Sequence, residues 1–310
     1  MSNPFSVHHY PVFKKGTFQN NPALFDRFIQ NTSDQIKRKY HQVRESIYRY
    51  EETITWPLVS GPGFSGGTHP GADNVFVKIM VGLSESIDNG DCLYVNPSQK
   101  IFAISDAPGL PTSSRKLLTR IDHCIREGYA NDITTIINTL NKETNQDDGA
   151  TLSLIYFPEN NSDNESGQAI VLIAGDTFLF HGNTFQRRLR LIPGIPDFFG
   201  TSHIYIEPTH IELAEGDFFI IASDGILTIR GNKEIKLEEA LLEDVNDSME
   251  DFALHVIRTS NQCYEAKIYD RTVTRFGGSD NISFLLVHPE KLIDTEHEDS
   301  FILGGNILKK

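Results

Sequence analysis

The feature that most constrains the fold of this chain is a succession of short apolar runs, each bounded by turn residues. The clearest runs are KIFAIS (100–105), TLSLIYF (151–157), AIVLIAG (169–175), DFFIIAS (217–223) and NISFLLV (281–287). A β-strand in a globular protein has about five or six residues, so each run is strand-sized. Because several runs follow one another across short polar turns, the sequence predicts antiparallel pairing.

Segments with the apolar period of an amphipathic helix lie between and after these runs. Residues 117–125 and 133–140 each place Leu and Ile side chains on one stripe, the second after a potential cap at Asn131. Residues 248–257 present a third apolar face. Strand meanders with inserted helices predict an α+β fold, a four-layer α/β/β/α sandwich of two antiparallel sheets flanked by helices.

Three regions differ in composition along the chain. Residues 1–52 form an N-terminal extension with one predicted helix at 36–50, residues 53–292 carry the strand-like runs, and residues 293–310 are expected to form a polar, loosely held tail. Within the large region, VSGPGFSGGTHPGAD (59–73) is interpreted as a glycine-rich loop.

Charge and cysteine content limit the classes of partner and compartment. The chain has 42 Asp and Glu against 28 Lys and Arg, and the formal net charge of −14 argues against nonspecific binding to nucleic acid, a polyanion. No apolar run approaches a membrane-spanning length, and the N-terminal residues lack the layout of a signal peptide. Cys92, Cys124 and Cys263 are widely spaced and suggest neither a disulfide framework nor a zinc site. We therefore expect a cytoplasmic protein with free thiols.

Four aspartates occupy the same kind of position, at the end of an apolar run. Asp106 follows IFAIS, Asp224 follows FFIIAS, Asp280 directly precedes NISFLLV, and Asp73 directly precedes NVFVKIM (74–80). Any one of them is explained as a turn residue. Four carboxylates at the ends of buried strands are costly to keep ionised without cations, and hard oxygen ligands select Mg²⁺, Mn²⁺ or Ca²⁺ over zinc. Together they predict a site for divalent cations.

The order of these segments resembles that of the metal-dependent protein phosphatases, the protein phosphatase 2C-like or PPM superfamily. The resemblance extends over residues 59–288 as short motifs: GADNVF, AISDAPG, GATLSLIYF, IAGDTFLF, LAEGDFFIIASDGI and GGSDNISFLLV. The last two motifs are the most specific, and the order of all of them makes the signal strong.

The resemblance implies a two-sheet sandwich with a binuclear Mn²⁺ or Mg²⁺ centre at one end. Carried over by motif, Asp73 would support both ions, Asp106 and the backbone carbonyl of Ala107 would bind them, and Asp224 and Asp280 would complete one shell. A water activated by the ions would attack the phosphorus of a phosphoserine or phosphothreonine in a protein substrate.

This chain departs from the family pattern at three positions. Ala107 replaces the glycine of the Asp-Gly motif, although a methyl group there need not abolish metal binding because the family uses the backbone carbonyl of this residue. Pro108 stands where some members have a histidine proposed as general acid, and a proline cannot protonate a leaving group. Many members carry a phosphate-binding arginine before the first aspartate, where GTHPGAD offers only His69. Arg187, Arg188 and Arg190 lie in a long connection that the sequence does not place near the site.

Several functions stay open on the sequence alone. The four aspartates favour an active phosphatase. Ala107, Pro108 and the missing arginine allow a phosphatase-like binding or regulatory protein with weak or no turnover. A hydrolase that uses two carboxylates as acid and base would leave the other two unexplained. Asp147 and Asp148 are interpreted as the end of a polar loop rather than a third metal site. Asp176 is interpreted as structural, and neither the target phosphoprotein nor the oligomeric state is indicated.

Overall fold

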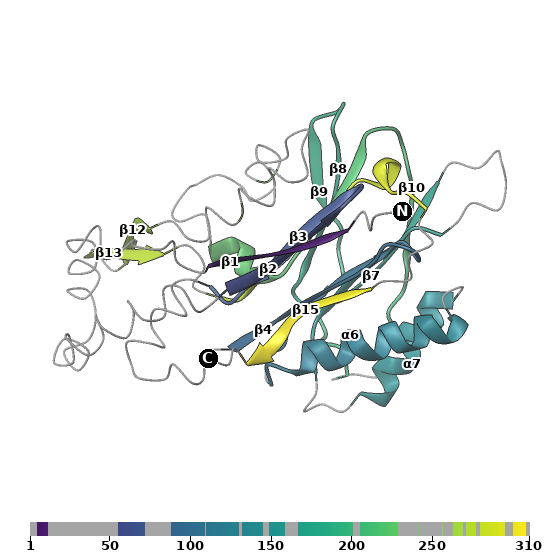
Figure 1. Cartoon of the computed structure of the whole chain (residues 1–310), viewed down its shortest axis with the longest axis horizontal. Coiled ribbons are helices and arrows are strands. Elements are labelled where there is room, and N and C mark those ends of the chain that lie inside the picture. Colours follow the sequence, from purple (N-terminus) through teal and green to yellow (C-terminus); the bar gives the residue numbers. More distant parts are fainter. Residues whose placement is uncertain are drawn as a thin grey trace.

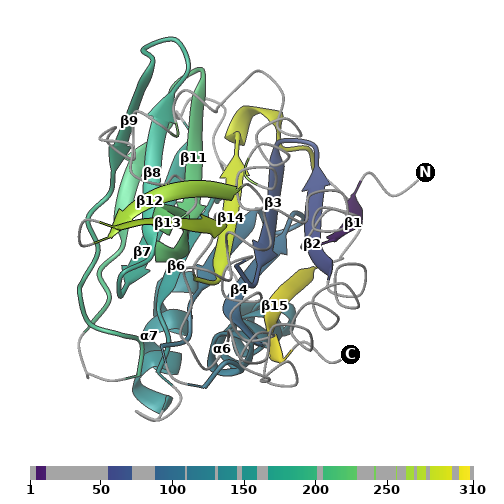
Figure 2. The ribbon, with the colours of Figure 1, turned by 90° about the vertical axis from the view of Figure 1, so that its left-hand side faces the viewer.

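Two antiparallel sheets packed face to face form the body of the protein. The computed structural model describes residues 5–11, 55–71, 88–108, 110–129, 132–144, 149–158, 167–200, 205–228, 241, 256, 263–268, 271–276, 280–294 and 300–307. The seven-stranded sheet has the order β1-β2-β3-β14-β11-β8-β9, and the six-stranded sheet the order β10-β7-β6-β5-β4-β15. Figure 1 shows the sheets as adjacent layers, and Figure 2 shows β1 and β9 at opposite edges of the larger one.

Five strands, β5, β6, β7, β11 and β14, match the clearest apolar runs of the sequence. The seven-stranded sheet contains β1 (Ser6–Pro11), β2 (Thr55–Gly61), β3 (Phe64–His69), β14 (Ile282–Val287), β11 (Asp217–Ala222), β8 (Phe178–Asn183) and β9 (Arg188–Leu191). The six-stranded sheet contains β10 (Thr209–Glu212), β7 (Gln168–Ala174), β6 (Leu152–Tyr156), β5 (Ile101–Ser105), β4 (Asp88–Asn96) and β15 (Phe301–Ile307). A hairpin of β12 (Cys263–Ile268) and β13 (Arg271–Phe276) stands apart from both sheets in Figure 1.

Alternate side chains of the central strands are divided between two cores. In β5, Phe102 and Ile104 join the core between the sheets, whereas Ile101 and Ala103 join the core beneath the helices. All of these side chains are fully buried. Burial on both faces explains why the sequence runs are continuously apolar instead of alternating with polar residues.

Two helices cover the outer face of the six-stranded sheet (Figure 1). α6 (Ser113–Cys124) and α7 (Ile133–Glu143) bury the predicted stripes there. α6 continues into a π-helical turn, η2 (Ile125–Tyr129), where Gly128 has a φ of 89°, in agreement with the predicted stop. The cap of α7 is Asp132, one residue after the predicted position, and its side chain accepts from Thr135 N at 3.0 Å. None of the helices within the described ranges is long and apolar enough to cross a membrane.

The outer face of the seven-stranded sheet is also buried. Phe180, Phe218 and Phe284 pack there in a third apolar cluster, which includes Leu241 and Val256. The predicted pair of antiparallel sheets and one helical layer are therefore present. The predicted helix at 248–257 lies outside the described residues except for Val256.

Two local predictions are wrong. The segment interpreted as a glycine-rich loop forms the β2–β3 hairpin as far as His69. Its glycines allow close packing, because a Cβ at Gly66 would overlap the Leu285 side chain of the neighbouring β14.

The expected loose tail contains β15, which pairs with β4 as the edge strand of its sheet. A register shift lies between Gly304 and Asn306, and Gly304 and Gly305 both have positive φ. This interruption hides the strand from a search for continuous apolar runs.

His288 gives a pH-dependent contribution to folding stability. It is 5% exposed and stacks on Phe218 with ring centroids 5.5 Å apart, and burial, followed by the charge of Lys291, lowers its pKa to about 4. Since the unfolded chain binds this proton near pH 6.5, the contribution is complete above that pH and is lost as the pH falls from about 6.5 to about 4. Between these pH values, the unfolding free energy of His288→Phe should decrease by up to about 3 kcal/mol less than that of the natural protein, as measured by urea unfolding. If the unfolding free energies of the variant and the natural protein changed equally with pH, His288 would not be the source of this dependence.

Candidate active site

The carboxyl end of β5 and the end of β11 bring acidic residues of both sheets to one end of the sandwich. Cys92 of β4 pairs with Ser105 of β5, which places Asp91 beside Asp106. In the other sheet, β11 pairs with β14 so that Asp224 and Asp280 both lie at the same end of that strand pair. The Ser223 hydroxyl donates to Asp91 Oδ2 and so joins the two sheets. We call Asp91, Asp106, Asp224 and Asp280 the acidic cluster.

Asp91 is a member of this cluster that the motif comparison missed. It is 1% exposed and lies within β4, where it directly precedes the apolar run CLYV in the sequence, as Asp280 directly precedes NISFLLV. The rule that selected the other aspartates would therefore have found Asp91 if it had been applied to this short run. Asp73 itself lies outside the described residues.

A buried hydroxyl network holds Asp91 in place. Ser223 Oγ accepts from Ser283 N at 2.9 Å while it donates to Asp91. Ser283 Oγ donates to Thr68 Oγ1 at 2.8 Å, and the Asn89 side chain donates to the same oxygen at 2.8 Å. All of these side chains are 2% exposed or less. Hydrogen bonds from strands of both sheets therefore restrict the orientation of Asp91.

Asp106 is held by the strand that follows the helices. Thr151 N donates to the Asp106 carbonyl, and Asp106 N donates to Thr151 Oγ1, both at 2.8 Å. Ser105 Oγ donates to the Thr151 carbonyl at 2.7 Å. These bonds fix the backbone on either side of the Asp106 carboxylate.

Asn281 connects three segments around the cluster. Its side chain accepts from Gly90 N at 2.7 Å and donates to the Pro70 carbonyl at 3.0 Å, and its backbone N donates to Asp280 Oδ1 at 2.8 Å. A Cβ at Gly90 would lie 3.4 Å from the Ala107 carbonyl oxygen. The carbonyl that the family resemblance assigns as a ligand is therefore close to the backbone that carries Asp91.

The carboxylates of the cluster repel one another. Burial, and next the charge of Asp106, raise the pKa of Asp91 well above its usual range, and the two carboxyl groups are hydrogen-bonded. Burial also raises the pKa of Asp106. Burial followed by the charges of Asp106, Asp280 and Asp176 raises the pKa of Asp224 to about 6. Asp176, interpreted from sequence as structural, thus lies near enough to add to the negative field.

The donor atoms of the cluster fit a hard divalent cation. Carboxylate oxygens and a backbone carbonyl are the ligands that Mg²⁺ and Mn²⁺ prefer, and a cation would offset the mutual repulsion. No group of three His, Cys, Asp or Glu side chains in the described residues is close enough to hold an ion without rearrangement. The chemistry of these donor groups therefore fits a divalent cation.

Of the basic residues considered from the sequence, Arg188 and Arg190 lie away from the cluster, whereas His69 pairs with Ile282 of β14 at the same end of the sandwich as Asp280. His69 is fully buried, and its Nδ1 accepts from Gly71 N at 2.8 Å. Arg188 and Arg190 line a different cavity, which none of the four clustered aspartates lines. Asp147 and Asp148 lie outside the described residues.

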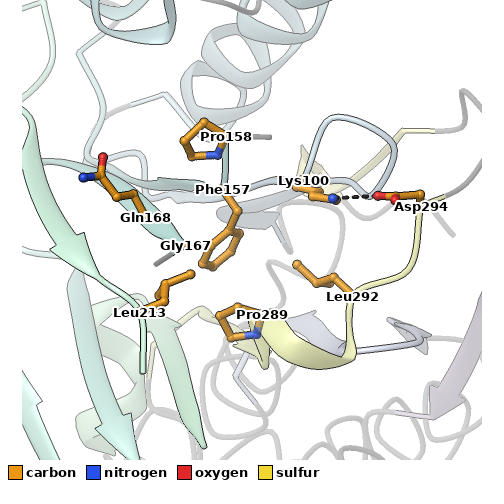
Figure 3. Close-up of a pocket in the computed structure, with 9 residues that line it drawn as sticks. All are labelled: Lys100, Phe157, Pro158, Gly167, Gln168, Leu213, Pro289, Leu292 and Asp294. Carbon is orange, nitrogen blue, oxygen red and sulfur yellow. Dashed lines mark ion pairs between the residues drawn. The ribbon is translucent and has the colours of Figure 1, made fainter. Parts of the chain in front are cut away.

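A cavity of about 440 Å³ at the far end of the sandwich is not the candidate active site (Figure 3). Lys100 and Phe157 on its wall lie at the opposite ends of β5 and β6 from Asp106 and Thr151. Lys100 is paired with Asp294 at 2.6 Å, and the remaining wall is largely Pro and Leu. It contains no cluster of groups suited to catalysis.

Comparison with known proteins identifies the fold. The chain is similar to the structure of PppA, a key regulatory component of T6SS in Pseudomonas aeruginosa, with a TM-score of 0.52 and 16% identity over 73% of this chain and 96% of that chain. The fold is that of the PP2C-type phosphatases. The serine/threonine phosphatase PstP/Ppp of Mycobacterium tuberculosis has a TM-score of 0.47 at 14% identity, over 72% of this chain and 96% of that chain.

Comparisons of the sequence do not identify a family for this chain. No family model matches the chain, and no curated protein matches its sequence. At 16% identity, the similarity to PppA shows the fold alone. Any activity must therefore be argued from the residues of the acidic cluster.

Proposed function

We propose that this chain is a metal-dependent protein phosphatase that hydrolyses phosphoserine or phosphothreonine. The observation that carries the proposal is the acidic cluster, gathered from both sheets at one end of a PP2C-type sandwich. A cluster of carboxylates that raise one another's pKa is a common sign of a functional site. Structural ion pairs would instead place a Lys or Arg among them, and no described Lys or Arg side chain forms an ion pair with a member of the cluster.

Asp91, Asp106, the Ala107 carbonyl, Asp224 and Asp280 would hold the ions. Asp73 remains a proposed additional ligand. When bound, two Mn²⁺ or Mg²⁺ ions would supply an activated water nucleophile and positive charge for the phosphoryl oxygens. We also infer the four-layer sandwich, since Leu241 and Val256 join the apolar cluster on the outer face of the seven-stranded sheet.

The other residues of the site orient these ligands. Ser223 fixes Asp91, Thr151 fixes the backbone of Asp106, and Asn281 ties the chain beside Asp91 to the chain beside Asp280. Such outer contacts commonly change metal affinity by about 10- to 100-fold. Pro108 carries no proton to give, so the leaving alkoxide would take its proton from water.

A regulatory protein without turnover is the second candidate. It is favoured by Pro108 and by the position of Arg188 and Arg190, which line a cavity that none of the four clustered aspartates lines. Under this alternative the acidic cluster would still bind cations but would not release phosphate.

Phosphate release from a phosphothreonine peptide tests the proposal directly. We expect turnover with Mn²⁺, none with chelator, and a loss of at least about 100-fold in Asp224→Asn, because the variant removes a ligand charge next to the reacting phosphate. Metal-dependent thermal stabilisation of the natural protein, measured in parallel, reports binding without turnover. Stabilisation without phosphate release from any phosphopeptide would favour the regulatory alternative, and the absence of both would contradict the metal site.

A further inference from the structure

A groove separates the two edge strands on one side of the sandwich. β9 ends the seven-stranded sheet and β10 ends the six-stranded sheet, and no described strand pairs with the outer edge of β9, which Figure 2 shows at the edge of its sheet. A cavity of about 560 Å³ lies between them and is lined by residues of β8, β9, β10 and β11. We call it the β9–β10 groove.

The inner wall of the groove is polar although it belongs to the space between the sheets. Asp217 accepts from Asn183 Nδ2 at 2.7 Å and from Ala214 N at 3.0 Å, and its Oδ2 lies 2.9 Å from His181 Nε2. Burial opposes ionisation of Asp217, but its hydrogen bonds to Ala214, Asn183 and His181 prevail and lower its pKa. The Asp217 carboxylate therefore has its hydrogen-bond partners within the protein, and no arginine pairs with it in the described residues.

Two arginines on β9 face this wall. His181 pairs with Arg190 and Asn183 pairs with Arg188 across the β8–β9 ladder, and directly paired residues share a face of the sheet. Arg190 Nη2 lies 3.4 Å from His181 Nδ1. Within the part of the chain that the structure describes, neither guanidinium forms an ion pair with a carboxylate, even though Glu212 of β10 also lines the groove.

Exposed apolar groups flank the arginines. Phe185, in the β8–β9 turn, is 71% exposed, and Leu191, at the end of β9, is 45% exposed. Aromatic and arginine side chains together are typical of the binding surfaces of proteins. Two guanidinium groups without a carboxylate partner among the described residues, in a chain with a net charge of −14, mark this edge as complementary to an acidic partner.

We propose that the β9–β10 groove binds an acidic, extended segment of a partner protein, which adds a strand to the free edge of β9 and sets its carboxylates against Arg188 and Arg190. An added strand gains main-chain hydrogen bonds, and its alternate side chains meet those of the edge strand on the groove face. The inference does not depend on phosphatase activity, since the groove is lined by none of the four clustered aspartates.

Fluorescence anisotropy with a short labelled peptide that alternates Glu and Val tests this proposal. Measured in chelator, so that the acidic cluster plays no part, the natural protein should bind the peptide, and added salt should weaken binding. Arg188→Glu combined with Arg190→Glu should weaken it at least about tenfold. Arg120→Glu with Lys142→Glu, on the exposed surfaces of α6 and α7, makes the same change in net charge and should change binding much less.

A second peptide separates strand addition from simple charge attraction. N-methylation of alternate backbone amides keeps every charge but removes the hydrogen bonds of one strand edge, and it should abolish binding. Equal binding of the methylated peptide would overturn the added strand. No binding to the natural protein, or equal weakening by both double variants, would overturn the groove as a docking site.

Discussion

Replacing Asp91 with asparagine is expected to abolish metal-dependent phosphate release and to stabilise the metal-free protein. Asp91 is a buried carboxyl group whose pKa is raised first by burial and then by the charge of Asp106. Asparagine keeps its shape and can still accept from the Ser223 hydroxyl. It removes one charge from a site that carries no compensating cation in the metal-free state.

Turnover and stability should change in opposite directions, because the Asp91 charge would hold metal ions in the proposed site but repels neighbouring carboxylates in the metal-free protein. Loss of a ligand carboxylate should lower turnover about 1000-fold. Relief of the repulsion should raise stability by about 1 kcal/mol, or about 2 °C in the unfolding temperature of a chain of this size. Phosphate release with Mn²⁺ and thermal unfolding in chelator measure the two effects separately.

Asp217→Asn provides the matched control for the stability effect. Asp217 is equally buried, but hydrogen bonds hold its pKa below the usual range, and an amide NH₂ would face the donors of Asn183 or His181. The same substitution should therefore destabilise the protein at this position. If Asp91→Asn also destabilised the metal-free protein, repulsion within the cluster would not be the controlling effect.

The positions of five strands, β5, β6, β7, β11 and β14, could be predicted from sequence because their apolar runs are buried on both faces. KIFAIS and DFFIIAS become β5 and β11, and the aspartates that follow them meet at one end of the sandwich. β15 escaped because the glycines at 304 and 305 break its run and because only its pairing with β4 makes it a strand. A strand of this kind is fixed by its neighbour and not by its own apolar pattern.

Asp91 is a residue of the acidic cluster that the order of the sequence motifs does not identify. The sequence offers both Asp73 and Asp91 ahead of Asp106, each directly before an apolar run. What distinguishes Asp91 is the pairing of β4 with β5, together with the hydroxyl of Ser223 that reaches it from the other sheet. The contact between Ser223 and Asp91 joins residues 132 positions apart, so no local pattern contains it.

Replacing Gly225 with alanine is expected to damage both the fold and the acidic cluster. Gly225 follows Asp224 in the short 3₁₀ helix η5 (Asp224–Thr228), and it is buried against the start of β14. An added Cβ would overlap the carbonyl oxygen of Asn281 and would lie 3.1 Å from Ile282 Cγ1. Because the obstacle is backbone, a side-chain rotation cannot relieve it, and η5 must move away from β14.

That movement would separate Asp224 from Asp280, which sit on the two segments. We expect a loss of about 3 kcal/mol in unfolding free energy, as for an overpacked core, and a fall in turnover of about 100-fold for a displacement near 1 Å.

Gly128→Ala is the control. A Cβ there meets nothing within 4 Å, so only its left-handed φ of +89° is penalised, by about 1 kcal/mol. Urea unfolding and phosphate release of the two variants decide the matter. Equal stabilities would show that η5 and β14 adjust to each other freely, and the cluster would then owe its geometry to Asn281 and Ser223 rather than to this close contact.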